Sequence, residues 1–130
     1  MKFMLLQDYG GVEADIPVIW EWAPEDAAAH IEFQKDMNDE LKESGEFVEA
    51  QGLTAPELAK FVVSDGTKTV VTDGPFPESK ELLAGYRMID VESVERALEI
   101  AARASAAPGP EGIPIRQRIE VREVMGPIEH

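Results

Sequence analysis

Short apolar runs and one long helical pattern divide the chain into its expected elements. The run Phe3-Met4-Leu5-Leu6 has the length of a buried strand, and Pro24 followed by two acidic residues marks a helix that Gly45 ends. Asp65-Gly66 between two β-branched runs signals a hairpin turn. Strands are predicted over 2–9, 47–53, 60–64, 67–72, 82–89 and 115–124, and helices over 24–44 and from about 90 or 93 to the 106–112 loop.

The order of these elements predicts an α+β fold in a single domain over residues 1–130. It is a ferredoxin-like split pattern with an inserted hairpin, in which two helices cover one face of an antiparallel sheet. Several strands are apolar on both faces, as Val62-Val63 and Val70-Val71 illustrate. Because two helices cover only one face, we expect a second copy of the chain to cover the other, forming a homodimer.

The first predicted helix has a polar stripe within its apolar face. His30, Gln34 and Asn38 follow one another at four-residue steps and fall in the arc expected to face the sheet. An unsatisfied buried polar group costs about 1–3 kcal/mol, so this stripe needs partners in the sheet, in ordered water or in a ligand. The apolar face predicted around it consists of Ala27, Ile31, Phe33, Met37 and Leu41.

Two further apolar groups are expected to pack against the body. The segment 10–23 carries too many large apolar side chains for a free linker, among them Trp20 and Trp22. In the second helix the predicted buried face consists of Val91, Val94, Leu98 and Ala101.

Charge and composition narrow the classes of partner. The formal net charge of −14 disfavours binding to nucleic acid or to an anionic membrane. The chain has no cysteine, which excludes disulfides, thiolate metal ligands and a cysteine nucleophile. The apolar run after Met1 is shorter than a signal-peptide core or a membrane span. The absence of cysteine leaves the redox compartment undetermined. We expect a cytoplasmic protein.

The stretch from Thr72 to Tyr86, which contains Asp73-Gly74-Pro75-Phe76, resembles the signature of the DGPF group within the YCII-related family. Residues 1–6, 51–53 and 119–124 also match the family pattern, so the resemblance covers nearly the whole chain. It implies a ferredoxin-like subunit that forms a dimeric α+β barrel. Many members of the group are encoded beside extracytoplasmic-function sigma factors or fused to them, which implies a regulatory role.

The wider family includes a dehydrochlorinase of a chlorinated hydroxyhydroquinone, and its members have a proposed histidine and aspartate pair in a cleft. The resemblance matches that histidine to His30. The family's aspartate follows the second helix, where this chain has Ala106-Ala107-Pro108-Gly109 instead.

Six residues are the candidates for chemistry or binding. His30 is the natural general base, and Asp73 is the carboxylate that could work with it as a catalytic pair. Ligand-binding roles are predicted for Gln34, Asn38, Tyr86 and Arg118. These candidates also have structural readings. Examples are His30 as a packed histidine, Asp73 as a turn anchor and Arg118 as a member of cross-strand ion pairs. No motif for a metal or a cofactor is present, and we expect neither.

These observations favour a homodimeric small-molecule-binding or regulatory protein linked to sigma-factor signalling. The alternative is a cofactor-free lyase or isomerase that uses His30 and Asp73 in an enclosed cleft. A third reading is a pure interaction module.

Overall fold

A computed structural model describes residues 1–8, 19–73 and 83–127. It contains six strands and two α-helices in this part of the chain. Their bounds are β1 Lys2–Asp8, α1 Pro24–Ser44, β2 Phe47–Gly52, β3 Lys60–Ser64, β4 Thr69–Asp73, β5 Leu83–Asp90, α2 Val94–Ser105 and β6 Ile119–Glu123. Short 3-10 helices lie at Ile19–Glu21, Pro56–Leu58 and Pro110–Gly112.

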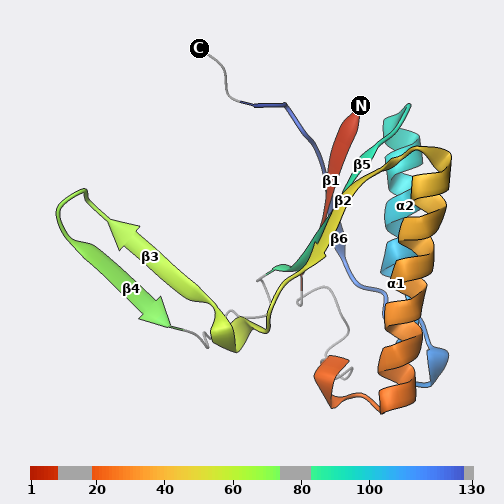
Figure 1. The fold of residues 1–130 in the computed structure, drawn as a ribbon, viewed down its shortest axis with the longest axis horizontal. Coiled ribbons are helices and arrows are strands. Elements are labelled where there is room, and N and C mark those ends of the chain that lie inside the picture. The colour runs from red at the N-terminus through yellow and green to blue at the C-terminus, as the bar shows by residue number, and fades with distance from the viewer. Residues whose placement is uncertain (9–18, 74–82, 128–130) are drawn as a thin grey trace.

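Four strands form the main sheet in the order β2-β5-β1-β6, and every neighbouring pair is antiparallel. Counted along the chain without the hairpin strands, this is the order 2-3-1-4. Both α-helices lie against one face of the sheet (Figure 1). The predicted α+β class is confirmed, and the arrangement is consistent with a ferredoxin-like fold.

The inserted hairpin is a separate two-stranded sheet of β3 and β4, and it projects away from the main sheet and the helices (Figure 1). Its turn follows the sequence signal, because Gly66 has φ +92° and the Asp65 carboxylate accepts hydrogen bonds from the backbone N–H groups of Thr67 and Lys68. Every residue of β3 and β4 is exposed, including Val63 at 72%. The apolar hairpin is therefore uncovered in the single chain.

Helix α1 begins and ends where the sequence predicts. Pro24 occupies its first turn, and Gly45 follows its end in the left-handed region with φ +78°. The N–H of Glu46 donates to the carbonyl oxygen of Leu41 at 2.9 Å, which closes the last turn. Helix α2 starts after Ser93, whose Oγ accepts a hydrogen bond from the N–H of Arg96 at 3.1 Å.

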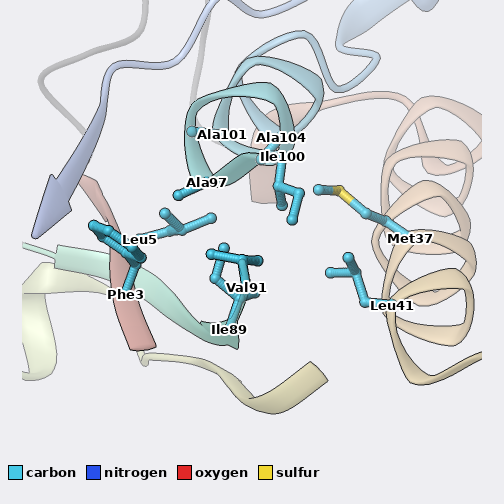
Figure 2. Close-up of a cluster of buried hydrophobic side chains, with 10 residues drawn as sticks. All are labelled: Phe3, Leu5, Met37, Leu41, Ile89, Val91, Ala97, Ile100, Ala101 and Ala104. Atoms are coloured by element: carbon cyan, nitrogen blue, oxygen red, sulfur yellow. The ribbon is translucent and has the colours of Figure 1, made fainter. Parts of the chain in front are cut away.

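The core lies between the helices and the sheet (Figure 2). Phe3 and Leu5 of β1 alternate with Met4 and Leu6, which are half-buried on the opposite face. Phe3 and Leu5 belong to one apolar cluster that also takes residues from the two helices and from β5 and the residue after it. Its remaining members are Met37, Leu41, Ile89, Val91, Ala97, Ile100, Ala101 and Ala104.

The predicted face of the second helix is wrong in part. Val94 is 41% exposed and Leu98 is 52% exposed, whereas the buried positions are Ala97, Ile100, Ala101 and Ala104. Three alanines in this set let the helix approach the sheet closely, so small side chains rather than the largest apolar ones define its inner face. Ile31 of α1, also predicted to be buried, is 53% exposed.

The last strand is shorter than predicted, because residues 115–118 follow an irregular path. Arg116 has φ +55°, and the N–H groups of Ile115 and Gln117 bond to the carbonyl oxygens of Ala107 and Ser105 instead of to a neighbouring strand. Tyr9, Leu82 and the Gly74-Pro75-Phe76 part of the signature lie outside the described residues.

Candidate functional site

A cavity of about 450 Å³ lies between the N-terminal half of α1, the adjoining ends of β2 and β5, and the tryptophan-containing segment before α1. Both tryptophans of the chain line it. They belong to the segment 10–23 that is predicted to fold back onto the body, of which residues 10–18 lie outside the described residues. The lining residues are Gln7, Ile19, Trp20, Trp22, His30, Gln34, Asn38, Ala50, Gln51, Gly52, Leu53, Ala55, Ala84, Gly85, Tyr86, Arg87, Ile115 and Gln117.

The predicted polar stripe of α1 faces this cavity, and the structure supplies its partner in the sheet. The Nε of Arg87 donates to Oδ1 of Asn38 at 2.8 Å, and its Nη2 donates to Oε1 of Gln34 at 2.8 Å. The Nε2 of Gln34 lies 3.4 Å from Nε2 of His30. A continuous hydrogen-bonded chain therefore runs from the sheet along α1.

His30 ends this chain at the loop after α2. Its Nδ1 lies 2.9 Å from the carbonyl oxygen of Pro108, which can only accept, so Nδ1 carries a proton. In the neutral ring Nε2 then holds the lone pair and accepts from the Gln34 amide. The Trp22 ring packs on the imidazole edge-on, with centroids 5.4 Å apart. Burial lowers the pKa of His30 from its usual 6.5, while the Pro108 hydrogen bond opposes that shift.

Arg87 is a residue of the site that the sequence interpretation missed. Its side chain is 3% exposed and comes from β5 on the same face as buried Gly85 and Ile89. Strict alternation along β5 places a charged side chain inside the core face, and this was the signal that could have found it. Burial, and then repulsion from Arg103, lower the pKa of Arg87.

Tyr86 also lines the cavity, and its predicted ligand-binding role stays a prediction. Desolvation and then a hydrogen bond to the Glu49 carboxylate raise the pKa of its phenol. Gln117, which was not predicted, is buried in the cavity wall, where its Nε2 donates to the carbonyl oxygen of Asp8 at 3.0 Å.

The structure does not bring Asp73 or Arg118 to this cavity within one chain. Asp73 lies on β4 with its side chain 70% exposed, and its carboxylate accepts a hydrogen bond from Nζ of Lys60 at 2.7 Å. The Nη2 of Arg118 bonds to the Asp8 carboxylate at 3.0 Å, and its side chain is 69% exposed. Their predicted roles in catalysis and ligand binding stay predictions.

The cavity has the groups to hold an organic molecule by hydrogen bonds and by stacking on aromatic rings. Within residues 1–8, 19–73 and 83–127, no three histidine or acidic side chains are grouped as a metal site would require. No helix in these ranges is both long and apolar enough to span a bilayer.

The comparison with protein families gives a match over most of the chain. The model of the YCII-related domain matches residues 1–117. An uncharacterized protein of Rhizobium meliloti strain 1021 is 29% identical over 93 residues, which cover 72% of this chain and 75% of the relative.

Proposed function

The chain belongs to the YCII-related family, and on that premise we propose that it is a homodimeric protein that binds a small organic molecule in the cavity beside His30. One observation carries the proposal: the polar stripe of α1 meets the buried guanidinium of Arg87 on the wall of a cavity that both tryptophans line. A volume of about 450 Å³ falls in the range of known ligand pockets.

A ligand screen with a blocked cavity tests this proposal. Gly52 lines the cavity, and a Cβ placed there meets open space, so Gly52→Phe adds bulk without a backbone clash. A metabolite that raises the melting temperature of the wild-type protein should lose that effect in Gly52→Phe. Val48→Phe is the matched control, because Val48 lies on the same strand, is 41% exposed and does not line the cavity.

The screen contradicts the proposal if no compound shifts the wild-type melting temperature. It also contradicts it if every stabilising compound acts equally on Gly52→Phe, because the ligand would then bind elsewhere.

The homodimer is supported by two uncovered apolar surfaces of the single chain. One is the exposed hairpin, and the other is the sheet face opposite the helices, where Met4, Leu6 and Met88 are half-buried. A two-stranded hairpin alone is marginally stable in water, so a covering partner is expected. A second copy of the chain, in the dimeric α+β barrel that the resemblance implies, would cover the open face of the sheet.

Membership of the DGPF group, a cytoplasmic location and the link to sigma factors belong to the same proposal and rest on the sequence alone. Co-purification of the tagged protein with a sigma factor from its own cells tests the regulatory link. Failure to recover one under conditions that retain the homodimer would count against it.

A cofactor-free lyase or isomerase is the second candidate, and the neutral imidazole of His30 favours it. A neutral ring can accept a proton at Nε2 once a substrate displaces the Gln34 amide. Because Asp73 does not line the cavity of its own chain, this reaction would need Asp73 from another copy. Asp73→Asn separates the two candidates: it should abolish turnover if the pair is catalytic and leave ligand affinity unchanged if the protein only binds.

A further inference from the structure

Arg87 is a buried cation whose charge is not compensated by the residues around it. Its Nε and Nη2 donate to two neutral amides, those of Asn38 and Gln34, and its Nη1 has no hydrogen-bond partner in the part of the chain that the structure describes. Among the described residues no carboxylate forms an ion pair with it. A buried guanidinium stays protonated, so a positive charge resides in the cavity wall.

The electrostatic surroundings make this charge costly. Removing an ion from water is unfavourable unless a partner of opposite charge compensates it. Among the described residues, the cation of Arg103 also acts on Arg87 and lowers its pKa further. The chain as a whole carries a net charge of −14, so its many carboxylates could have supplied a partner at this position. The amides of Gln34 and Asn38 accept hydrogen bonds from Arg87 but do not neutralise its charge. A bound molecule of opposite charge would neutralise it.

The other walls of the cavity restrict what that molecule can be. Trp20 and Trp22 line the same space, and aromatic side chains favour a planar, apolar body that can stack on them. Sites for phosphate usually combine several cations or backbone N–H groups, whereas the described side chains of this wall include one guanidinium, that of Arg87, and neutral amides. A single guanidinium group is suited to pair with a single carboxylate group of a ligand.

We propose that the cavity binds a planar aromatic carboxylate, whose carboxylate group pairs with Arg87 and whose ring lies against the tryptophans. The proposal rests on the proposed function, since it names the class of ligand for the same cavity. Nη1 is enclosed by the protein, so a ligand oxygen reaches it only after neighbouring side chains make room. The missing acceptor at this donor favours that rearrangement.

The test compares acids with their uncharged amides. Benzoate, 4-hydroxybenzoate and 2-naphthoate are titrated against benzamide, 4-hydroxybenzamide and 2-naphthamide. The readout is intrinsic tryptophan fluorescence, which reports on this site because both tryptophans line the cavity. We expect at least one acid to bind about tenfold more tightly than its amide, since a charge-assisted contact is worth that ratio or more.

Two variants assign the preference to Arg87. Arg87→Gln should reduce the acid-to-amide ratio to about one while the amide still binds, and Arg87→Lys should retain part of the ratio because it keeps the charge but loses the planar fork. Arg122→Gln is the matched control, because Arg122 is 70% exposed on β6 and pairs with Glu120. Circular dichroism confirms that each variant is folded before it is titrated.

The outcomes separate the two proposals. If amides bind as tightly as acids, or if Arg87→Lys and the folded Arg87→Gln both keep the full ratio, the carboxylate inference is overturned and the ligand cavity stands. If none of the six compounds binds, the carboxylate inference is also overturned. If in addition the metabolite screen of the Gly52→Phe experiment finds no ligand, the proposed function fails with it.

Discussion

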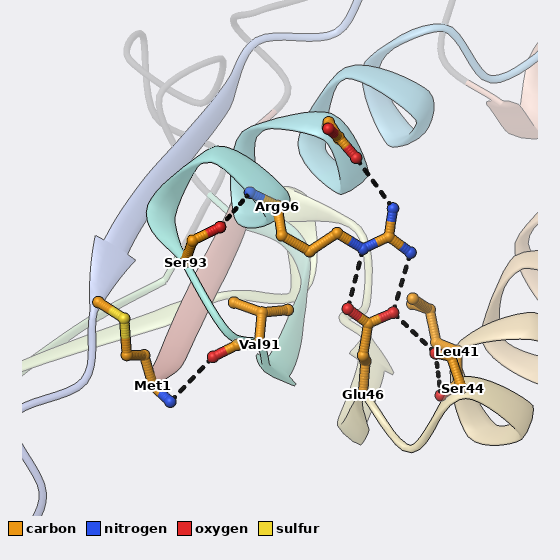
Figure 3. Close-up of polar contacts among 8 residues, drawn as sticks. Met1, Leu41, Ser44, Glu46, Val91, Ser93 and Arg96 are labelled. Carbon is orange, nitrogen blue, oxygen red and sulfur yellow. Dashed lines mark hydrogen bonds and ion pairs between the residues drawn. The ribbon is translucent and has the colours of Figure 1, made fainter.

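Arg96 and Glu46 form a bidentate ion pair that joins the first turn of α2 to the short connection between α1 and β2 (Figure 3). Nε of Arg96 lies 2.9 Å from Oε2 of Glu46, and Nη2 lies 2.9 Å from Oε1. The hydroxyl of Ser44 donates to the same carboxylate at 2.7 Å. The Glu46 side chain is only 15% exposed, so this pair is shielded more than an ordinary surface ion pair.

We predict that Arg96→Gln lowers the free energy of unfolding by about 1–2 kcal/mol at neutral pH, because it removes two charge-assisted hydrogen bonds from a partly buried carboxylate. Arg103→Gln is the control, because Arg103 pairs with Glu40 where the two side chains are 42% and 58% exposed, and it should cost less than about 1 kcal/mol. Urea denaturation of the three proteins measures the difference.

The pH dependence gives a second check of the same pair. The hydrogen bonds from Arg96 are the main reason that the pKa of Glu46 lies below its usual 4.5. A lowered carboxyl pKa contributes stability that is present above 4.5 and is lost as the pH falls through the folded-state pKa. The gap between wild type and Arg96→Gln should therefore shrink in acid, and a gap that stays constant would contradict the assignment.

The inner face of α2 gives a prediction for the core. Ile100 is fully buried, whereas Leu98, two positions away, is 52% exposed. Ile100→Ala should reduce the free energy of unfolding by about 2–5 kcal/mol through lost burial and a residual cavity, and Leu98→Ala should cost less than about 1 kcal/mol. Chemical denaturation measures both. Equal losses would mean that Leu98 is covered, for instance by a second copy of the chain.

This helix also shows where prediction from the sequence reaches its limit. Caps and turn residues act locally, so Pro24, Gly45, Ser93 and Asp65-Gly66 predicted their elements correctly. Which stripe of α2 faces inward depends on how closely the helix approaches the sheet. That distance is a property of packing, and the large apolar residues alone misdirected the assignment.

The candidate site was predictable to a similar extent. The four-residue spacing of His30, Gln34 and Asn38 indicated a buried polar stripe, because helical periodicity fixes which side chains share a face. Their partner Arg87 is 53 positions beyond Gln34, and only the register of β5 against α1 brings the two together. The roles predicted for Asp73 relied on a short motif, and no local rule states which surface a projecting hairpin meets.

The hairpin of β3 and β4 carries the prediction for assembly. Val62 pairs with Val71 on one face and Val63 with Val70 on the other, so both faces are apolar and exposed. We expect light scattering at micromolar concentration to give twice the mass of one chain. Val63→Lys with Val71→Lys should weaken the dimer by placing one charge on each face.

Thr67→Lys is the control for this assembly experiment, because it adds a charge at the exposed turn without removing apolar surface. It should leave the dimer intact. A wild-type mass equal to one chain would contradict the homodimer. A dimer that persists unchanged in the double variant would place its interface on the open face of the sheet instead of on the hairpin.

The burial of His30 predicts how stability changes near neutral pH. Burial holds the pKa of His30 below 6.5 in the folded protein, so the unfolded chain takes up a proton first as the pH falls. Wild-type protein should therefore lose stability from this group below pH 6.5, down to the folded-state pKa. His30→Gln can still donate to the Pro108 carbonyl but cannot titrate, so it should lack this loss.

Urea denaturation of both proteins at about pH 7.5 and about pH 5.5 measures this contribution as the change in their stability difference. His130 occurs in both proteins, so its titration cancels in the comparison. The difference should move in favour of the variant at the lower pH. A difference that is constant, or that moves toward the wild type, would mean that the folded protein accommodates a charged His30, and the buried neutral imidazole assigned to the cavity wall would be wrong.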